Sequence, residues 1–124
     1  MENMSKKGIT VASSKEFIEN DSVKWEPVAK GIRRKIMAFA EKIMLVRVEF
    51  ENGGVGSAHS HSHVQVTNVE SGVFEIEIGG EKKILKAGDA FYVPSNILHG
   101  AVCIEAGVLV DVFSPMRKDF IENK

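Results

Sequence analysis

The residues best suited to chemistry are three histidines and a glutamine at alternate positions, within the run His59-Ser60-His61-Ser62-His63-Val64-Gln65. Alternate residues of a regular β-strand lie on the same face, so we expect these four side chains to point the same way. Neutral imidazole is a common ligand of zinc, copper, iron and nickel, and packing alone does not explain so dense a cluster. The run therefore predicts a metal site.

A second candidate is Asp111, which interrupts the otherwise apolar run 108–113. A buried carboxylate is costly unless it is paired or used. By the alternation of a strand, Asp111 and Phe113 share one face, and Arg117 follows closely enough to reach the same end of the fold. Two interpretations stay open: either these three side chains gather near the metal, or Asp111 pairs with Arg47 or Arg117 at a sheet edge and Phe113 is core.

Short apolar segments separated by turn residues predict a mainly β fold between residues 37 and 115. The predicted strands are 43–50, 73–78, 81–86, 91–93, 99–104 and 108–113, and the turns between the later ones are 79–80, 87–89, 94–96 and 105–107. Many short strands at close spacing favour a closed barrel or a double sheet, because both arrangements leave few exposed strand edges. We therefore expect one small barrel.

Segment 73–78 alternates between apolar and acidic residues, which predicts a strand with one wet face. The apolar face holds Phe74, Ile76 and Ile78. Gly79-Gly80 offers the positive φ angles that a tight hairpin needs. On the returning strand, we expect Ile84 to point inward.

The residues before the barrel predict an irregular amino-terminal arm. Serines in the run 13–20 favour a short capped helical turn. Residues 25–36 contain Pro27 and Gly31 and are expected to be irregular. The basic trio Arg33-Arg34-Lys35 is interpreted as a solvated charged edge. We therefore divide the chain into an arm, 1–35, and a barrel domain, 36–124.

Length and composition indicate an ordinary globular protein of one domain. The chain has 124 residues, 44% of them hydrophobic and 27% charged, with a formal net charge of −1. This charge gives no reason to expect nucleic acid or an anionic membrane as a partner. One cysteine, Cys103, excludes an internal disulfide, and we find no signal peptide or membrane span. A cytoplasmic location is expected.

The spacing of the metal candidates resembles the two motifs of the cupin family. The first reads Gly53, five residues, His59-x-His61, three residues, Gln65, six residues and Gly72. The second reads Gly88, five residues, Pro94, then Asn96 where the family usually has glycine, and His99. The resemblance spans roughly residues 36 to 113. It implies an all-β, single-domain, jelly-roll-like barrel with the two motifs on facing strands.

The same resemblance implies a metal site. Its ligands would be His59, His61, Gln65 and His99, holding one divalent transition-metal ion: nickel, zinc, iron or manganese. His63 is no ligand in the family pattern, so it is either a pocket residue or simply exposed. Gln65 stands where glutamate is more usual, which leaves the charge of the ion unneutralised and favours an anionic ligand.

A closer resemblance is to the KdgF-type proteins of pectin and alginate breakdown. It rests on Gly31-Ile-Arg-Arg-Lys-Ile36, the histidine run, Gly79-Gly-Glu-Lys-Lys, His99-Gly-Ala-Val, and the segment 105–117. That family converts 4,5-unsaturated monouronates into linear keto forms. The resemblance implies an isomerase-like enzyme in which Asp111 moves a proton, Arg117 holds the uronate carboxylate and Phe113 packs against the sugar.

Two other functions are compatible with the sequence. One is a metal-dependent dioxygenase, and Gln65 in place of a carboxylate argues against it. The other is a sugar- or anion-binding module without catalysis, which substitution of Asp111 separates from an enzyme. Under each reading we expect a homodimer, because the outer face of strand 43–50 needs cover, with the amino-terminal arm crossing to the partner.

Overall fold

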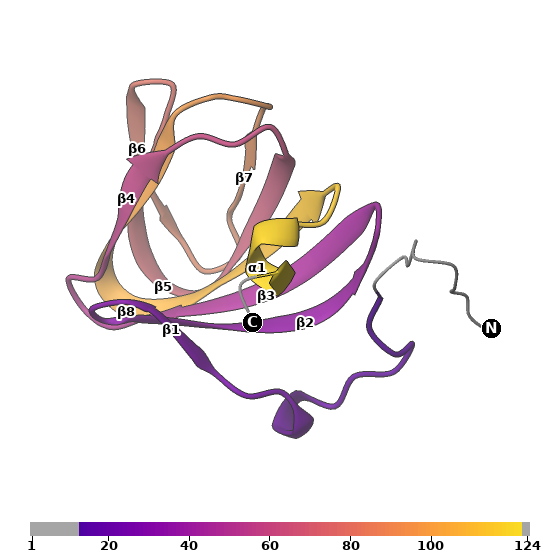
Figure 1. The fold of residues 1–124 in the computed structure, drawn as a ribbon. Helices are drawn as coiled ribbons and strands as arrows, with labels where there is room; N and C mark the ends of the chain where they lie inside the picture. The colour runs from indigo at the N-terminus through magenta and orange to yellow at the C-terminus, as the bar shows by residue number, and fades with distance from the viewer. Residues whose placement is uncertain (1–12, 123–124) are drawn as a thin grey trace.

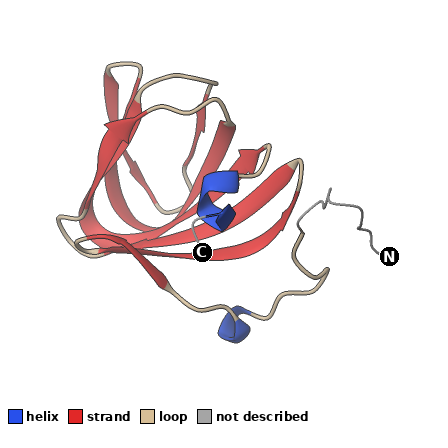
Figure 2. Cartoon of the chain, viewed as in Figure 1, coloured by secondary structure: helices blue, strands red, loops and turns tan. Residues whose placement is uncertain are grey.

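The computed structural model describes residues 13–122, and nearly all of their regular structure is strand (Figures 1 and 2). In chain order the elements are the 3₁₀ helix η1 (Asn20–Ser22), β1 (Glu26–Ala29), β2 (Ile32–Ala40), β3 (Ile43–Phe50), β4 (Val55–His59), β5 (Val64–Ile78), β6 (Glu81–Lys86), β7 (Ala90–Val93), β8 (His99–Ser114) and helix α1 (Lys118–Glu122). The all-β prediction is confirmed. No helix within 13–122 is long and apolar enough to cross a membrane.

One antiparallel sheet makes up the fold. Its main path runs β1-β2-β3-β8-β5-β6, while β4 pairs with β8 and β7 pairs with β5. The two long strands β5 and β8 bend, so that each has neighbours on both sides of the molecule. Figure 1 shows β2 and β3 on one side, β4, β6 and β7 on the other, and α1 between these two groups in this view.

Two groups of buried side chains form the interior. The first consists of Ile32, Phe50, Val69, Phe74, Ile76, Cys103 and Leu109, and the second of Met44, Val46, Phe113 and Met116. Phe120 and Ile121 of α1 pack against the second group, so the carboxyl-terminal helix is anchored at that end of the barrel. Members of both groups also line the central cavity described below.

Alternation predicted the inward side of segment 73–78 correctly. The strands at 43–50 and 81–86 have the predicted bounds, and Phe74 and Ile76 are buried. The prediction for Ile84 was wrong, because its side chain is 59% exposed. The register pairs Phe74 with Leu85 and places Ile84 opposite Glu75 on the outer face. Two adjacent apolar residues made the inward position ambiguous, and pairing with β5 decided it.

The turn predicted at 105–107 was wrong, since β8 continues through it. The two predicted strands are halves of one bent strand, and its pairing with β5 shifts register near Ser71. At the bend, Gly107 lies directly against the main chain of Ser71 and Gly72, where a Cβ atom on Gly107 would collide with the Ser71 carbonyl oxygen. Glycine at positions 72 and 107 therefore permits β5 and β8 to cross closely.

The amino-terminal predictions also need correction. Residues 13–19 form no helical turn, and the short helix begins only at Asn20. The stretch expected to be irregular forms β1 and the start of β2. Of the basic trio only Arg33 lies at a solvated edge. Lys35 is only 6% exposed and donates to the main-chain and side-chain oxygens of Asn20 at 3.0 and 3.1 Å. The division at residue 35 stays a prediction, and β2 runs across it; residues 1–12 of the arm lie outside the described residues.

Candidate metal centre

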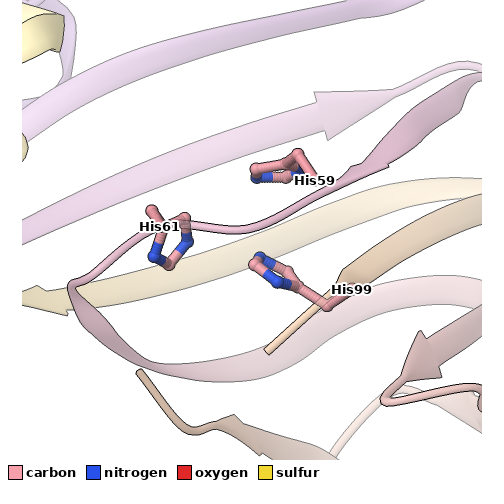
Figure 3. Close-up of side chains that lie close together, drawn as sticks. All are labelled: His59, His61 and His99. Atoms are coloured by element: carbon pink, nitrogen blue, oxygen red, sulfur yellow. The ribbon is translucent and has the colours of Figure 1, made fainter. Parts of the chain in front are cut away.

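Three histidines converge from three different elements of the barrel (Figure 3). His59 ends β4, His61 lies in the loop before β5, and His99 begins β8 directly opposite His59 in the sheet register. The expectation of one regular strand through the histidine run was therefore wrong, since residues 60–63 form a connection between two strands. The convergence arises from this loop and from the pairing of β4 with β8.

The turn at 94–96 holds the loop in place. The Asn96 N–H donates to the carbonyl oxygen of His61 at 2.7 Å, and the Ser95 hydroxyl donates to that of Ser62 at 2.6 Å. Asn96 has a φ of 65°, the left-handed conformation that asparagine tolerates better than most residues. Asparagine thus does here what glycine does in the usual motif.

The geometry of the three imidazoles suits one ion. One potential ligand atom from each of His59, His61 and His99 lies within 4.8 Å of those of the other two. The ring centroids of His59 and His99 are 4.4 Å apart, and those of His61 and His99 are 4.7 Å apart. Figure 3 shows the rings gathered around a common space.

Main-chain carbonyl groups fix which nitrogen of each ring faces that space. In all three histidines Nδ1 lies at hydrogen-bond distance from a carbonyl oxygen two residues away, so the neutral ring donates through Nδ1–H and keeps its lone pair on Nε2. The acceptors are the carbonyl oxygens of Ser57, His63 and Ile97, at 2.9, 2.9 and 2.8 Å. The Nε2 atom of His99 is buried and has no hydrogen-bond partner among the described residues. A metal ion would supply that missing partner.

Burial also keeps two of these rings in the form that binds a metal. It is the main cause that lowers the pKa of His61 and of His99, and the positive charge of Arg117 lowers the pKa of both further. A low pKa favours the neutral imidazole, which alone has a lone pair to offer.

Gln65 completes the set from the start of β5, where it is 6% exposed. Thr67 Oγ1 lies 2.6 Å from Asp111 Oδ1 and must donate to this carboxylate, so it accepts from Gln65 Nε2 at 2.9 Å. The amide oxygen of Gln65 consequently faces His61 Nε2, at 3.2 Å. Both atoms carry lone pairs when His61 is neutral, and a cation bound between them would relieve their repulsion. The donor set therefore fits a divalent transition metal.

Asp111 lies next to this set, half-buried, with Thr67 and Gln65 both donating to its Oδ1. Burial raises its pKa to about 6, although the Thr67 hydrogen bond and the charge of Arg117 both act to lower it. Neither predicted ion pair forms, because Arg47 pairs with Glu70 and Arg117 pairs with Asp119. The first interpretation of Asp111 accordingly fits the structure better than the sheet-edge one.

Phe113 and Arg117 lie in the same region. Phe113 is 3% exposed and packs edge-on against His61, with ring centroids 5.7 Å apart. The guanidinium carbon of Arg117 lies 5.1 Å from the Phe113 ring centroid and 4.3 Å from that of Phe120. Phe113 is therefore both a core residue and a wall of the site.

A central cavity of about 290 Å³ joins these groups. Its lining includes six of the predicted site residues: His59, Gln65, His99, Asp111, Phe113 and Arg117. Sequence reasoning missed Thr67, Arg34 and Phe120. Thr67 follows Gln65 by two residues on β5, so the alternation of that strand was a signal that could have found it. Arg34 and Phe120 line the cavity, and nothing local in the sequence marks them as site residues.

His63 is not one of the clustered ligands. Its ring is half-buried and packs edge-on against the ring of His61, with centroids 5.5 Å apart. Burial, followed by the charge of Arg117, lowers its pKa. Of the two alternatives left open for His63, the structure supports a residue that packs against the site, through its contact with His61.

Known proteins with similar sequences and structures agree with this geometry. Residues 46–113 match the model of the cupin domain. The chain is 43% identical over 109 residues to the pectin degradation protein KdgF of Dickeya dadantii, a match that covers 86% of this chain and 99% of that protein.

Two solved structures are similar to this chain in both fold and sequence. KdgF from Halomonas sp. has a TM-score of 0.82 and 44% identity, covering 85% of this chain and 99% of that one. An RmlC-like cupin from Shewanella frigidimarina has a TM-score of 0.85 and 39% identity, covering 87% and 97%. The extent of these matches, together with the clustered histidines, shows that the chain belongs to the cupin family and, within it, to the KdgF proteins.

Proposed function

We propose that this cupin is an isomerase-like enzyme that opens 4,5-unsaturated monouronates, released from pectin or alginate, to linear keto-uronates. The observation that carries the proposal is Asp111, a half-buried carboxylate with a raised pKa that shares one cavity with the histidine cluster and Arg117. The pectin degradation protein KdgF, at 43% identity over nearly its whole length, supports the same reaction.

In this proposal His59, His61, Gln65 and His99 hold one divalent transition metal, with nickel, zinc, iron and manganese as the candidates. When bound, such an ion polarises a substrate oxygen and stabilises negative charge that builds on it. The remaining chemistry falls to the side chains of the cavity.

Asp111 would move the proton. An unsaturated monouronate is both an enol ether and a hemiacetal. Loss of the proton from the anomeric hydroxyl forms a carbonyl at C1 as the bond between C1 and the ring oxygen breaks, and return of a proton at C4 converts the resulting enolate to a ketone. The change is an isomerisation, so atoms balance without an oxidant. A carboxyl group with a pKa of about 6 both accepts and returns a proton readily near neutral pH.

Arg117 and Phe113 would orient the sugar. Guanidinium geometry favours paired hydrogen bonds to a carboxylate, and the Phe113 ring offers a flat apolar surface to the sugar ring. The cavity of about 290 Å³ lies at the small end of the roughly 300–1,000 Å³ typical of ligand pockets. That size favours a single sugar ring over an oligosaccharide.

The decisive test is a time course on 4,5-unsaturated galacturonate, followed by ultraviolet absorbance and proton NMR. Metal-loaded wild type, chelated wild type and Asp111→Asn are compared, with Asp21→Asn on the exposed helix η1 as the matched control. We expect rapid loss of the double bond only with wild type and the control in their metal-loaded forms. A wild-type rate equal to the spontaneous rate, with bound metal confirmed, would refute the proposal.

We also propose a homodimer. The outer sheet surface carries an apolar row that crosses five strands through paired residues: Ala38, Leu45, Val112, Val66 and Tyr92. Val66 is 51% exposed and Tyr92 57% exposed in the single chain. A second copy would cover this row, and light scattering on Val66→Lys tests it by the expected loss of dimer.

The buried free thiol of Cys103 suits the cytoplasmic location that we propose.

A further inference from the structure

We propose that Arg34 is a second carboxylate-binding residue of this cavity and acts together with Arg117 on the substrate. The inference rests on the proposed function, because it assigns a further group to the uronate carboxylate. Arg34 belongs to the basic trio that sequence reasoning assigned to a solvated edge, whereas in the structure it lines the cavity.

The alternation of β2 turns Arg34 inward. Its neighbours on the same face are Ile32, which is buried, and Ile36, which packs against the second core group. The adjacent Arg33 points outward, where its side chain is 49% exposed and pairs with Glu49. Arg34 is 21% exposed. The partly buried guanidinium pairs with Glu26 and packs over Phe120, and these contacts hold it at the cavity wall.

One aromatic ring connects Arg34 to Arg117. The guanidinium carbon of Arg34 lies 3.7 Å from the centroid of Phe120, and that of Arg117 lies 4.3 Å from the same centroid. The ring stabilises both cations, but the cations repel each other. An anion bound near both of them would turn this repulsion into attraction.

The donors of Arg117 give the main reason for a second cation. Its Nε donates to Asp119 Oδ1 at 3.1 Å and its Nη2 donates to Asp119 Oδ2 at 2.9 Å. The Nε–Nη2 side of the guanidinium is therefore occupied by Asp119, which leaves Arg117 only its outer donors for a substrate carboxylate. Arg34 bonds Glu26 through Nε at 2.7 Å, on the side of the guanidinium nearest its own main chain. The two Nη atoms of Arg34 take no part in that bond and would donate to a substrate carboxylate together with Arg117.

Contacts of the Phe113 ring connect the two arginines to the metal-ligand candidates. The Phe113 ring lies edge-on to both His61 and Phe120, with ring centroids 5.7 Å apart in each case. Arg34 packs on Phe120, whereas the histidine that contacts Phe113 is His61. A sugar lying along Phe113 would thus place its carboxylate toward the two arginines and its other oxygens toward the metal ligands.

The test compares binding of a stable acid and its neutral counterpart by calorimetry. Metal-loaded protein is titrated with D-galacturonate and with D-galactose, and kinetics are measured on the unsaturated monouronate. We expect Arg34→Gln to weaken galacturonate binding and raise KM by about tenfold each, while galactose binding and kcat change less than about threefold. Arg34→Lys, which keeps the charge, should fall between, and Arg33→Gln should match wild type.

Several outcomes would overturn the inference. Folded Arg34→Gln and Arg34→Lys proteins with wild-type affinity for galacturonate would do so, as would equal losses in Arg33→Gln. If Arg34→Gln does not fold, Phe120→Leu gives the second measurement, with the same selective loss of the acid expected. Absence of turnover by wild type would count against the proposed function alone, because galacturonate binding requires no reaction.

Discussion

Replacing Asp111 with asparagine should stabilise the metal-free protein while removing its activity. Asparagine keeps an oxygen that accepts from Thr67 but carries no charge. In the folded protein, burial raises the pKa of Asp111 from its ordinary value of 3.8 to about 6. The wild-type fold therefore bears the cost of an ionised, poorly solvated carboxylate at neutral pH, and the variant does not.

The shift gives both the size and the pH window of the effect. A rise of about two pKa units corresponds to about 3 kcal/mol of unfolding free energy, at 1.36 kcal/mol for each unit. The folded state holds the proton more tightly than the unfolded chain, so wild-type stability falls as the pH rises from 3.8 through about 6. The advantage of the variant should be small at pH 4, grow between pH 4 and 6, and stay constant above about pH 7.

Denaturant unfolding of chelated proteins at pH 4 and pH 7.5 measures this difference. Asp21→Asn is again the control, because it removes an exposed aspartate of the same charge and should change the pH dependence little. Turnover by the metal-loaded Asp111→Asn variant should fall by about 10² to 10⁴, the usual contribution of a general acid or base. A variant that is less stable than wild type at pH 7.5, or equally stable at both pH values, would show that the carboxylate is not strained and refute the reasoning.

Three further predictions concern the metal and the bend. His99→Ala should abolish metal binding while His63→Ala retains it, as metal analysis of purified protein would show, because only His99 aims a buried, unpartnered Nε2 into the cluster. Saturation with metal at about a hundred times Kd should raise the unfolding free energy by about 3 kcal/mol, measured with and without chelator; no change would contradict a native metal site. Gly107→Ala should lose about 2 kcal/mol or more in denaturant unfolding, whereas Gly56→Ala, whose Cβ would meet only ordinary contacts, should lose much less.

Residue patterns within one strand or motif predicted those features of the fold that neighbouring residues determine. Alternation gave the inward side of Phe74 and Ile76, and motif spacing brought together residues 40 positions apart, His59 and His99. Two of the failures are consequences of distant pairing. Pairing with β5 chose Leu85 over Ile84, and the crossing at Gly107 made one strand where two were expected.

The site shows the same division. The identity of the clustered histidines was predictable, but the loop that carries His61 is set by a hydrogen bond from Asn96, 35 residues later. Arg34 was misjudged because a run of three basic residues resembles a solvated surface. Only its place on β2, paired with β1 and β3, sends alternate members of the trio to opposite faces. Side-chain direction in such a run depends on strand register, which no short window contains.

Three unfavourable features of this protein lie together. The buried Nε2 of His99 has no partner in the described chain, lone pairs of His61 and Gln65 face each other, and Asp111 is held in a setting that opposes its charge. A fold selected for stability alone would remove such conflicts with apolar residues of similar size. All three border one cavity, and a bound cation would resolve the first two. The third leaves a carboxyl group able to exchange a proton near neutral pH, which is the property that the proposed ring opening requires.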